Sequence, residues 1–213
     1  MDNGASSYRR FLDGDNEGLA DIIRNYSDGL ILYINSFVRN ISISEEIMED
    51  VFVEIALKRP EYSGKSSFKT WLYAIARYTS IDRLKKNSRY CNIPVDEMHN
   101  VSDEQNLEKS YIRKEQKIRI HKALSRLKPD YRQVLYLVFL EEFSNSEAAL
   151  IMKKSSRQMK NLVYRAKSAL KQELEKDDYE YEEYKNNTTI EGLYTLKSIL
   201  SNLIKQFLFC FRN

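Results

Sequence analysis

The sequence predicts an all-α protein of two helical domains joined by a flexible linker, and three observations support this fold class. Only 6 glycines and 3 prolines interrupt the 213 residues, too few for an all-β fold with many turns. Apolar residues recur at helical spacing along most of the chain. A polar segment without this periodicity separates the periodic stretches into two groups, which indicates a linker.

The first domain is predicted over residues 1–88. Apolar residues within 19–37 form a helical stripe, and a second helix begins at Ser44, a candidate N-cap followed by acidic residues. Pro60 and Gly64 end that helix. The third helix has an apolar face formed by Phe68, Trp71, Leu72, Ile75, Ala76 and Thr79.

The third helix is also strongly basic, although the whole chain carries a net charge of only +3. Between residues 65 and 89, Asp82 is the only acid, and the basic residues are Lys65, Lys69, Arg77, Arg83, Lys85, Lys86 and Arg89. A solvated surface normally mixes both signs of charge. A negatively charged partner is therefore expected against this helix.

The second domain is predicted over residues 111–175, after a linker over residues 89–110. Ser144 and Glu147 form a capping box that begins a short helix. Ser155 caps a longer helix whose apolar face comprises Met159, Leu162, Val163, Ala166 and Leu170. A short helix, a tight turn and a longer helix form the helix-turn-helix pattern.

The longer helix has the side chains that read DNA. Residues 153–171 include seven basic residues and no acid. Arg, Gln and Asn pair with base edges, whereas Lys serves phosphates better. The candidate DNA-binding residues are Ser156, Arg157, Gln158, Lys160, Asn161, Tyr164 and Arg165. Two basic helical domains on one chain predict two contacts on one nucleic acid.

The remaining segment, residues 176–213, starts with an acidic, tyrosine-rich stretch. Residues 189–211 then predict a C-terminal amphipathic helix, too polar on one face to span a bilayer. An isolated helix with such an apolar stripe would aggregate, so we expect it to pack against the second domain or the linker. The alternatives are the first domain, a partner protein or a membrane surface.

Several classes of function are excluded by what the sequence lacks. It has no glycine-rich phosphate loop, no Cys-His or Ser-His-Asp arrangement and no metal-ligand spacing. No catalytic activity, cofactor, metal ion or small-molecule substrate is therefore expected. The two cysteines, Cys91 and Cys210, predict no disulfide framework and favour a cytoplasmic location. The polar start predicts no signal peptide, and the chain lacks the run of about 18 apolar residues that a membrane span needs.

Five segments resemble the bacterial extracytoplasmic-function (ECF) sigma factors of the sigma-70 family. "GDNEGLADIIRNYSDGLILYI", "SEEIMEDVFVEI" and "YSGKSSFKTWLYAIARYTSIDRLKK" resemble their region 2. "ALSRLKPDYRQVL" and the "FSNSEAALIMKKSSRQMKNLVYRAKSALKQEL" that follows resemble region 4. The resemblance covers residues 8–174 in the expected order. It implies a subunit that directs RNA polymerase to promoters.

The resemblance also implies roles for individual residues. Region 4 would read the −35 element through the helix-turn-helix, and region 2 would hold and help open the −10 element. The implied −10 residues are Tyr62, Ser63, Gly64, Lys65, Ser66, Arg77, Tyr78 and Arg83. Tyr62 would stack on a flipped-out base of the non-template strand. Trp71 would be structural.

The implied partners are core RNA polymerase, promoter DNA and an anti-sigma factor. Region 2 would bind the clamp coiled coil of the β′ subunit through Glu46, Glu49 and Asp50, and region 4 would contact the β flap. Without the resemblance, these acids would be interpreted as a solvated helix face.

Three positions depart from the family pattern. Tyr78 replaces a usual Asn beside the base pocket, and Glu49 replaces a usual Gln on the acidic face. Lys153 replaces a usual Gly in the helix-turn-helix turn. A left-handed Lys costs about 1 kcal/mol, so a different turn geometry is an alternative there.

Two other classes of protein fit parts of the sequence. One is a stand-alone helix-turn-helix transcription regulator that binds duplex operators as a dimer, with the first domain as its sensor. The other is an interaction protein whose basic faces bind an acidic partner. A sigma factor is expected to bind core polymerase and to show little specific duplex binding alone, whereas a stand-alone regulator does the reverse.

Overall fold

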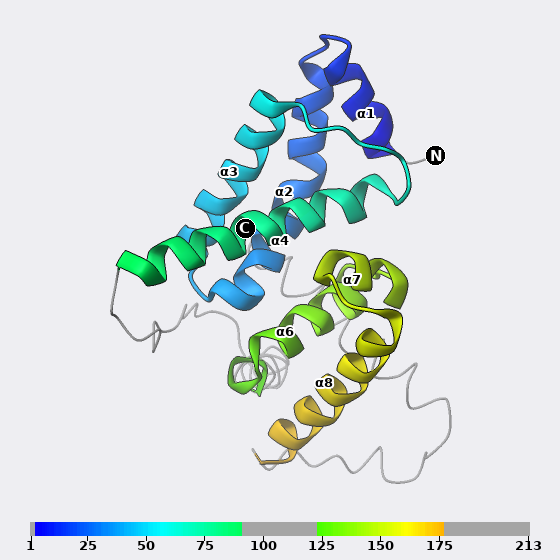
Figure 1. Ribbon diagram of the computed structural model, residues 1–213. Coiled ribbons are helices and arrows are strands. Elements are labelled where there is room, and N and C mark those ends of the chain that lie inside the picture. Colours follow the sequence, from blue (N-terminus) through cyan, green and yellow to red (C-terminus); the bar gives the residue numbers. More distant parts are fainter. Residues whose placement is uncertain (1–2, 91–122, 177–213) are drawn as a thin grey trace, which may run out of the picture. The chain divides into compact units, whose positions relative to one another are not determined.

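The computed structural model describes residues 3–90 and 123–176 (Figure 1). These residues form helices and connecting loops without any strand, so the predicted all-α fold class is confirmed for them. No helix in these two ranges is long and apolar enough to cross a membrane. Most of the expected linker, residues 91–110, and the expected tail helix, residues 189–211, lie outside the described residues.

The chain divides into two compact units. Of the described residues, 3–90 and 143–159 belong to the first unit, and 123–142 and 160–176 belong to the second. The helices of the first unit are α1 (Asn3–Leu12), α2 (Glu17–Val38), α3 (Ile41–Lys58), α4 (Phe68–Tyr90) and α7 (Asn145–Met152). The second unit contains α6 (Pro129–Leu135), the π-helix η1 (Tyr136–Leu140) and most of α8 (Ser156–Lys176).

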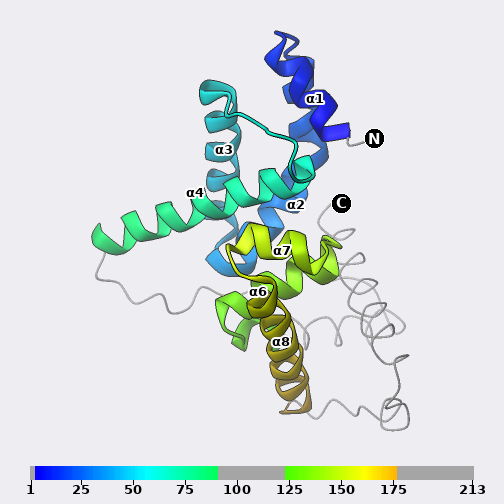
Figure 2. The same cartoon turned by 45° about the vertical axis from the view of Figure 1, so that its right-hand side comes forward.

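The core of the first unit forms where α2 packs against α3 and α4 crosses both helices (Figure 1, Figure 2). Burying one large apolar side chain contributes about 1.5–3 kcal/mol, so this set of side chains dominates the stability of the unit. The completely buried apolar side chains of these three helices are Ile22, Leu30, Tyr33, Ile34, Ile47, Val51, Ile55, Phe68, Leu72 and Ala76.

Gly18 allows α1 to pack closely on the start of α2. A Cβ atom at this position would lie 2.3 Å from the carbonyl oxygen of Ser7 and 2.7 Å from the backbone nitrogen of Phe11. Both are backbone atoms of α1, so a larger residue would push the helix away. The N-terminal helix is therefore part of the first unit's packing, with Tyr8 and Phe11 buried.

The apolar face predicted for α4 was too narrow. Phe68, Leu72 and Ala76 are buried as expected, but Tyr73 is also buried and Trp71 is only half-buried. Ile75 and Thr79, the remaining two residues of the predicted face, are also half-buried. Two polar residues outside the predicted face, Thr70 and Ser80, are buried. The reason is that α7 packs on a second side of α4, where the ring of Phe143 lies 5.1 Å from that of Tyr73.

Three helices of the first unit end at left-handed residues that are not glycine. The φ angles are 61° at Arg39 after α2, 44° at Arg59 after α3 and 51° at Lys153 after α7. A left-handed residue with a side chain costs about 1 kcal/mol relative to glycine. At Lys153 the alternative of a different turn geometry is thus not adopted: the left-handed turn is kept.

In the second unit, α6 begins at Pro129, as predicted, and leads directly into η1. Val134 and Leu137 are completely buried, and Phe139 is nearly so. The Nζ atom of Lys167, on α8, lies 4.9 Å from the centre of the Phe139 ring, and burial lowers the pKa of this lysine. The aliphatic stem of a basic residue thus covers part of the apolar core.

Candidate nucleic-acid interface and acidic face

Helix α8 exposes all seven of its candidate DNA-binding residues. Apolar side chains at helical spacing are buried on the opposite side: Met159, Val163, Ala166 and Leu170. Leu162, expected on that side, is half-buried. Tyr164 is 76% exposed, although an aromatic ring normally gains from burial. The exposed candidates are Ser156, Arg157, Gln158, Lys160, Asn161, Tyr164 and Arg165.

The start of α8 is organised by Ser155 and Gln158. The Ser155 hydroxyl oxygen accepts a hydrogen bond from the backbone N–H of Gln158 at 3.2 Å. The backbone N–H of Ser155 donates to Oε1 of Gln158 at 2.8 Å. This reciprocal cap confirms Ser155 as the N-cap and orients the Gln158 side chain, whose NH₂ group is not used by the cap.

Helix α7, the short helix of the pattern, begins with the predicted capping box. Ser144 accepts a hydrogen bond from the backbone N–H of Glu147 at 3.2 Å, and its own N–H donates to the Glu147 carboxylate at 2.9 Å. The same carboxylate accepts hydrogen bonds from Thr70 at 3.2 Å and Ser67 at 3.4 Å, both at the start of α4. Burial raises the pKa of Glu147, but these hydrogen bonds outweigh it and the net pKa is lowered.

We expect Glu147→Gln to lower the melting temperature at neutral pH. Because the folded protein holds the pKa of Glu147 below its unfolded value, the carboxylate contributes stability above the unfolded pKa. That contribution is lost as the pH falls through the folded pKa. The melting temperatures of variant and wild type should therefore converge in acid.

The measurement is a set of thermal unfolding curves from neutral to acidic pH. Glu142→Gln is the matched control, since it removes an exposed carboxyl two residues before the cap. A wild-type advantage that stays constant at all pH values would contradict the role of the carboxylate.

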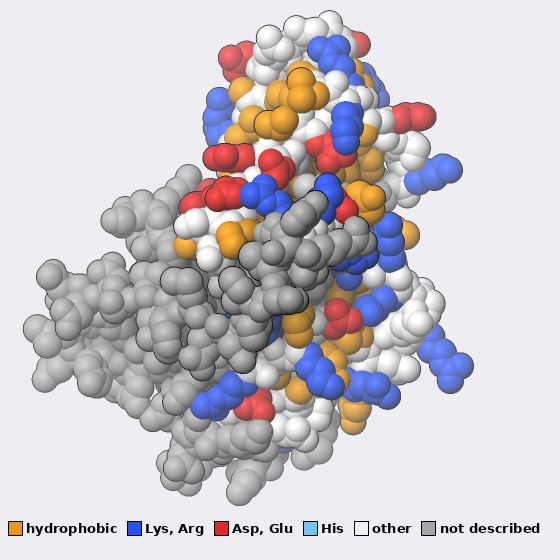
Figure 3. Space-filling view, turned by 60° about the vertical axis from the view of Figure 1, so that its left-hand side comes forward, with side chains coloured by type: hydrophobic (Ala, Val, Ile, Leu, Met, Phe, Trp, Pro, Cys, Tyr) orange, Lys and Arg blue, Asp and Glu red, His pale blue; other side chains and the backbone are white. Residues whose placement is uncertain are grey.

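Helix α3 exposes the three candidate acids, Glu46, Glu49 and Asp50. Acidic and basic side chains lie side by side on the face of the molecule that Figure 3 shows. The side chains of Glu46 and Asp50 are 56% and 49% exposed. Arg83 of α4 forms an ion pair with each of them, through Nη2 to Glu46 and Nη1 to Asp50. Glu49 is also exposed. Two of the three acids are therefore already paired with a guanidinium.

The loop between α3 and α4 holds Tyr62 in place. The Tyr62 hydroxyl donates to the carbonyl oxygen of Ser66 at 2.6 Å, and its ring packs edge-on against Phe68 with centroids 5.6 Å apart. Gly64 has a φ of 70° and open space around its Cα, so it permits the turn. Ser63, Gly64 and Lys65 are exposed, whereas Tyr62 and Ser66 are half-buried.

An aromatic cluster of Tyr8, Tyr62, Phe68 and Trp71 joins this loop to α1. The Tyr8 hydroxyl donates to the carbonyl oxygen of Pro60 at 2.6 Å, and its ring lies 5.2 Å from that of Trp71. Burial raises the pKa of Tyr8, against an opposing effect of the Arg59 charge. Sequence reasoning missed α1; the helical spacing of Tyr8, Phe11 and Leu12 before a glycine turn was the available signal.

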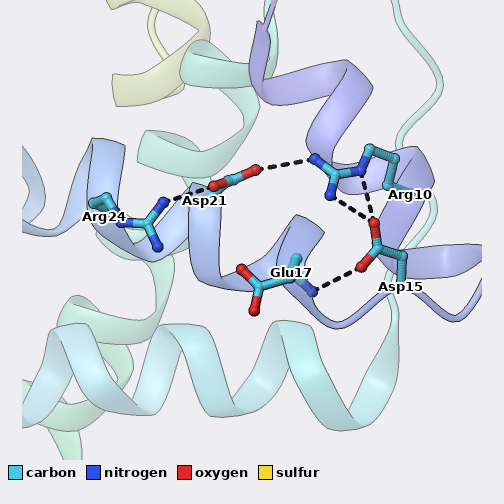
Figure 4. Close-up of polar contacts among 5 residues, drawn as sticks. All are labelled: Arg10, Asp15, Glu17, Asp21 and Arg24. Atoms are coloured by element: carbon cyan, nitrogen blue, oxygen red, sulfur yellow. Dashed lines mark hydrogen bonds and ion pairs between the residues drawn. The ribbon is translucent and has the colours of Figure 1, made fainter.

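A chain of ion pairs attaches α1 to α2 (Figure 4). Arg10 of α1 donates to Asp15 at 2.8 Å and to Asp21 of α2 at 3.0 Å, and Arg24 donates to Asp21 at 2.7 Å. Asp15 also accepts the backbone N–H of Glu17 at 3.0 Å. Hydrogen bonding lowers the pKa of Asp15. Such exposed pairs are individually weak, so their main effect is to fix the orientation of α1.

The basic residues of α4 do not form one uniform surface. The Nζ atom of Lys69 lies 4.9 Å from the centre of the Phe143 ring, and Lys86 pairs with Asp82 at 2.8 Å. Arg77 is half-buried, and Tyr78 is 61% exposed. The Nζ atom of Lys153 lies 5.3 Å from the centre of the Tyr78 ring, a cation–π contact. Tyr78 therefore presents an aromatic face at a position where the family that the sequence resembles usually has Asn, a side chain without a ring.

Two models of known protein families match this chain. Residues 22–90 match the model of sigma-70 region 2, and residues 117–170 match the model of sigma-70 region 4. Together the two models cover more than half of the chain, in the order of the resemblance. The chain belongs to the sigma-70 family. Helix α1 lies before both matched ranges.

Curated relatives place this sigma factor in the ECF group. It is 26% identical to the ECF RNA polymerase sigma factor SigW of Bacillus subtilis, over 76% of this chain and 91% of that protein. It is also 26% identical to the ECF RNA polymerase sigma factor SigX of the same organism, over 70% of this chain and 80% of that protein. The stand-alone regulator is therefore not favoured.

Solved structures agree on the fold of this sigma factor. CnrH, solved in complex with the cytosolic domain of CnrY, is 18% identical with a TM-score of 0.57, covering 82% of this chain and 96% of that chain. The sigma factor RpoE from Bartonella quintana, solved with the anti-sigma factor NepR, is 21% identical with a TM-score of 0.56. That match covers 73% of this chain and 97% of that chain.

The structure brings some of the predicted site residues of this sigma factor together and separates others. The seven residues of α8 share one exposed stretch, and the five loop residues 62–66 are contiguous. Arg83 lies apart from Tyr78, against α3 instead. Among the described residues, no group of three or more His, Cys, Asp or Glu side chains could hold a metal ion.

Proposed function

We propose that this ECF sigma factor binds core RNA polymerase and recognises the −10 and −35 promoter elements. It then helps to open the promoter, acting in the cytoplasm without a catalytic residue of its own. The observation that carries the proposal is that α8 exposes all seven candidate DNA-binding residues on a helix capped at Ser155. The exposed start of α8 has no acid and carries Arg, Gln and Asn, the side chains that form hydrogen bonds with base edges.

The −35 element is assigned to α8. Arg157 and Gln158 lie in the first turn, where a recognition helix meets base edges in the major groove. Lys160 and Arg165 are placed to contact phosphates, and Asn161 to contact a base or a phosphate. The positive end of the helix dipole at Ser156 adds attraction for the DNA backbone.

The −10 element is assigned to the loop of residues 62–66 and to Arg77 and Tyr78 on α4. Tyr62 would stack on a flipped base, which contributes about 1–3 kcal/mol and offsets much of the unstacking cost. The edge-on contact with Phe68 and the hydrogen bond to Ser66 support this role, because they fix the ring before a base arrives. The exposed ring of Tyr78 is a second candidate for stacking on a base.

The acids Glu46, Glu49 and Asp50 of α3 are assigned to the β′ clamp of core polymerase, and region 4 to the β flap. Their exposure supports contact with a basic partner. An anti-sigma factor is the second protein partner, by analogy with the complex of RpoE and the anti-sigma factor NepR. It is expected to compete with core polymerase for the same surfaces.

We expect Tyr62→Ala to impair promoter opening and Tyr62→Phe to preserve most of it. The phenylalanine keeps the ring that stacks, and it loses only the hydrogen bond to Ser66. Neither variant should change the affinity for core polymerase, because the acidic face lies on a different helix. The measurement is permanganate footprinting of unpaired thymines in the −10 region, with wild-type core binding as the control. Unchanged melting with Tyr62→Ala would contradict the stacking role.

A binding experiment tests the proposal against a stand-alone regulator. The purified chain is titrated separately with core polymerase and with promoter duplexes, and the holoenzyme is titrated with the same duplexes. We expect tight core binding, weak duplex binding by the chain alone and specific binding by the holoenzyme. Specific duplex binding by the chain alone, with no affinity for core polymerase, would contradict the proposed function.

A further inference from the structure

Arg83 occupies the acidic face in the free protein. It lies on α4, and its two terminal nitrogens reach different carboxylates one turn apart on α3, Nη1 to Asp50 and Nη2 to Glu46. Its side chain is 32% exposed, whereas those of Glu46 and Asp50 are 56% and 49% exposed. The Arg83 side chain is thus more covered than those of the acids, and about half of each acidic side chain remains open to a partner.

The ion pairs of Arg83 with Glu46 and Asp50 set the net charge of this part of the acidic face. Glu46 and Asp50 carry two negative charges, and Arg83 neutralises one of them. The charge of arginine is fixed, so Arg83 competes with any other cation that approaches the two acids. Each exposed ion pair is worth only about 0–1 kcal/mol, so replacing it requires little free energy.

Two roles compete for the same side chain. The resemblance implied that Arg83 contacts the −10 element and that Glu46 and Asp50 bind the β′ clamp, but in the structure they hold one another. A basic side chain that approaches the acids meets the positive charge of Arg83 and is repelled by it. The acids and Arg83 are therefore fully available to their partners only when they separate.

We propose that Arg83 is an internal placeholder for a basic side chain of core polymerase, and that docking of the polymerase displaces it toward a promoter phosphate. The proposal rests on the proposed function, in which these acids bind the β′ clamp. Displacement links the two binding events: polymerase on the acids frees Arg83 for DNA, and DNA on Arg83 frees the acids for polymerase. By linkage, each partner raises the affinity of the other by the same factor.

The test is Arg83→Gln, measured by titration of the purified chain with core polymerase at several salt concentrations. Removing the placeholder leaves both acids unpaired, so we expect core binding to tighten about threefold to tenfold at low salt, with a steeper salt dependence. Promoter binding by the variant holoenzyme should weaken. Lys86→Gln removes a positive charge from the same helix without touching the acids, and it should change core affinity less than about twofold.

Further variants distinguish a failure of the placeholder proposal from a failure of the proposed function. Arg83→Lys keeps the charge but lacks the planar fork, so it should tighten core binding only slightly and leave the salt dependence unchanged. If Arg83→Gln weakens core binding, or leaves both affinity and salt dependence unchanged, Arg83 is no placeholder. If Glu46→Gln with Asp50→Asn leaves core binding intact, the assignment of the acids to the polymerase fails instead. Melting curves of all variants check that the half-exposed pairs contribute little to folding.

Discussion

Replacing both Glu46 and Asp50 by lysine is expected to abolish binding to core polymerase while helix content stays the same. The substitutions convert two negative charges into two positive ones on a face that is assigned to a basic partner. Like charges across an interface cost several kcal/mol, so the dissociation constant should rise at least about 100-fold. Lysine and glutamate have similar helix propensity, so α3 should persist.

The measurement is equilibrium binding to labelled core polymerase, together with far-ultraviolet circular dichroism of each variant. Glu17→Lys with Asp28→Lys is the charge-matched control, because it makes the same change in net charge at exposed positions of α2. The control should bind core polymerase with nearly wild-type affinity. Equal loss of binding in both double variants would show that net charge, and not the acidic face, controls the association.

Replacing Arg157 or Gln158 by alanine is expected to cost about 1–3 kcal/mol in promoter binding and to relax specificity at one base of the −35 element. Both side chains are exposed in the first turn of α8. Lys160→Ala should instead weaken binding to all promoters similarly. It should also reduce the slope of the logarithm of the binding constant against the logarithm of the salt concentration by about 1, as removal of a phosphate contact does. The contrast separates base contacts from phosphate contacts on one helix.

Holoenzyme binding to a set of promoters with single −35 substitutions measures these effects. Gln158→Ala also removes the acceptor for the backbone N–H of Ser155, so its melting temperature is measured alongside. Gln158→Glu keeps that acceptor and removes the donors. Its added charge weakens binding to all promoters, so the base contact is measured as the part of the loss that depends on the −35 sequence. Uniform weakening of all promoters by Arg157→Ala would contradict the assignment of this residue to a base edge.

The exposed surface of α8 could be predicted from sequence because its information is local. A serine cap sets the start of the helix, and the 3.6-residue period then determines which side chains face the core. Both helices of the helix-turn-helix start within one residue of their predicted caps, Ser144 and Ser155. The exposure of Arg157 and Gln158 follows from these two facts alone.

The pairing of Arg83 could not be predicted in this way. Its partners Asp50 and Glu46 lie 33 and 37 residues away in sequence, and only the packing of α4 on α3 brings them together. Sequence periodicity describes one helix at a time, so a basic residue near a nucleic-acid site is interpreted as a phosphate contact. The same limit explains why the burial of Tyr73 was missed, since it depends on α7.

Lys153 shows a third kind of limit. The sequence showed that a lysine stands at a turn position where glycine is favoured, and two outcomes were open. The left-handed conformation at φ 51° is kept because the backbone N–H of Lys153 must still bond the last carbonyls of α7. Whether a helix end tolerates such a residue depends on the balance of a local cost of about 1 kcal/mol against that cap.

Run-off transcription with purified core polymerase tests the central claim most directly. Genomic fragments identify promoters first, and each promoter is then compared with versions in which the −35 or the −10 element is scrambled. We predict a specific transcript that requires the chain, the core polymerase and both intact elements, and that is lost with Glu46→Lys and Asp50→Lys. Equal transcription from intact and scrambled promoters would contradict the account.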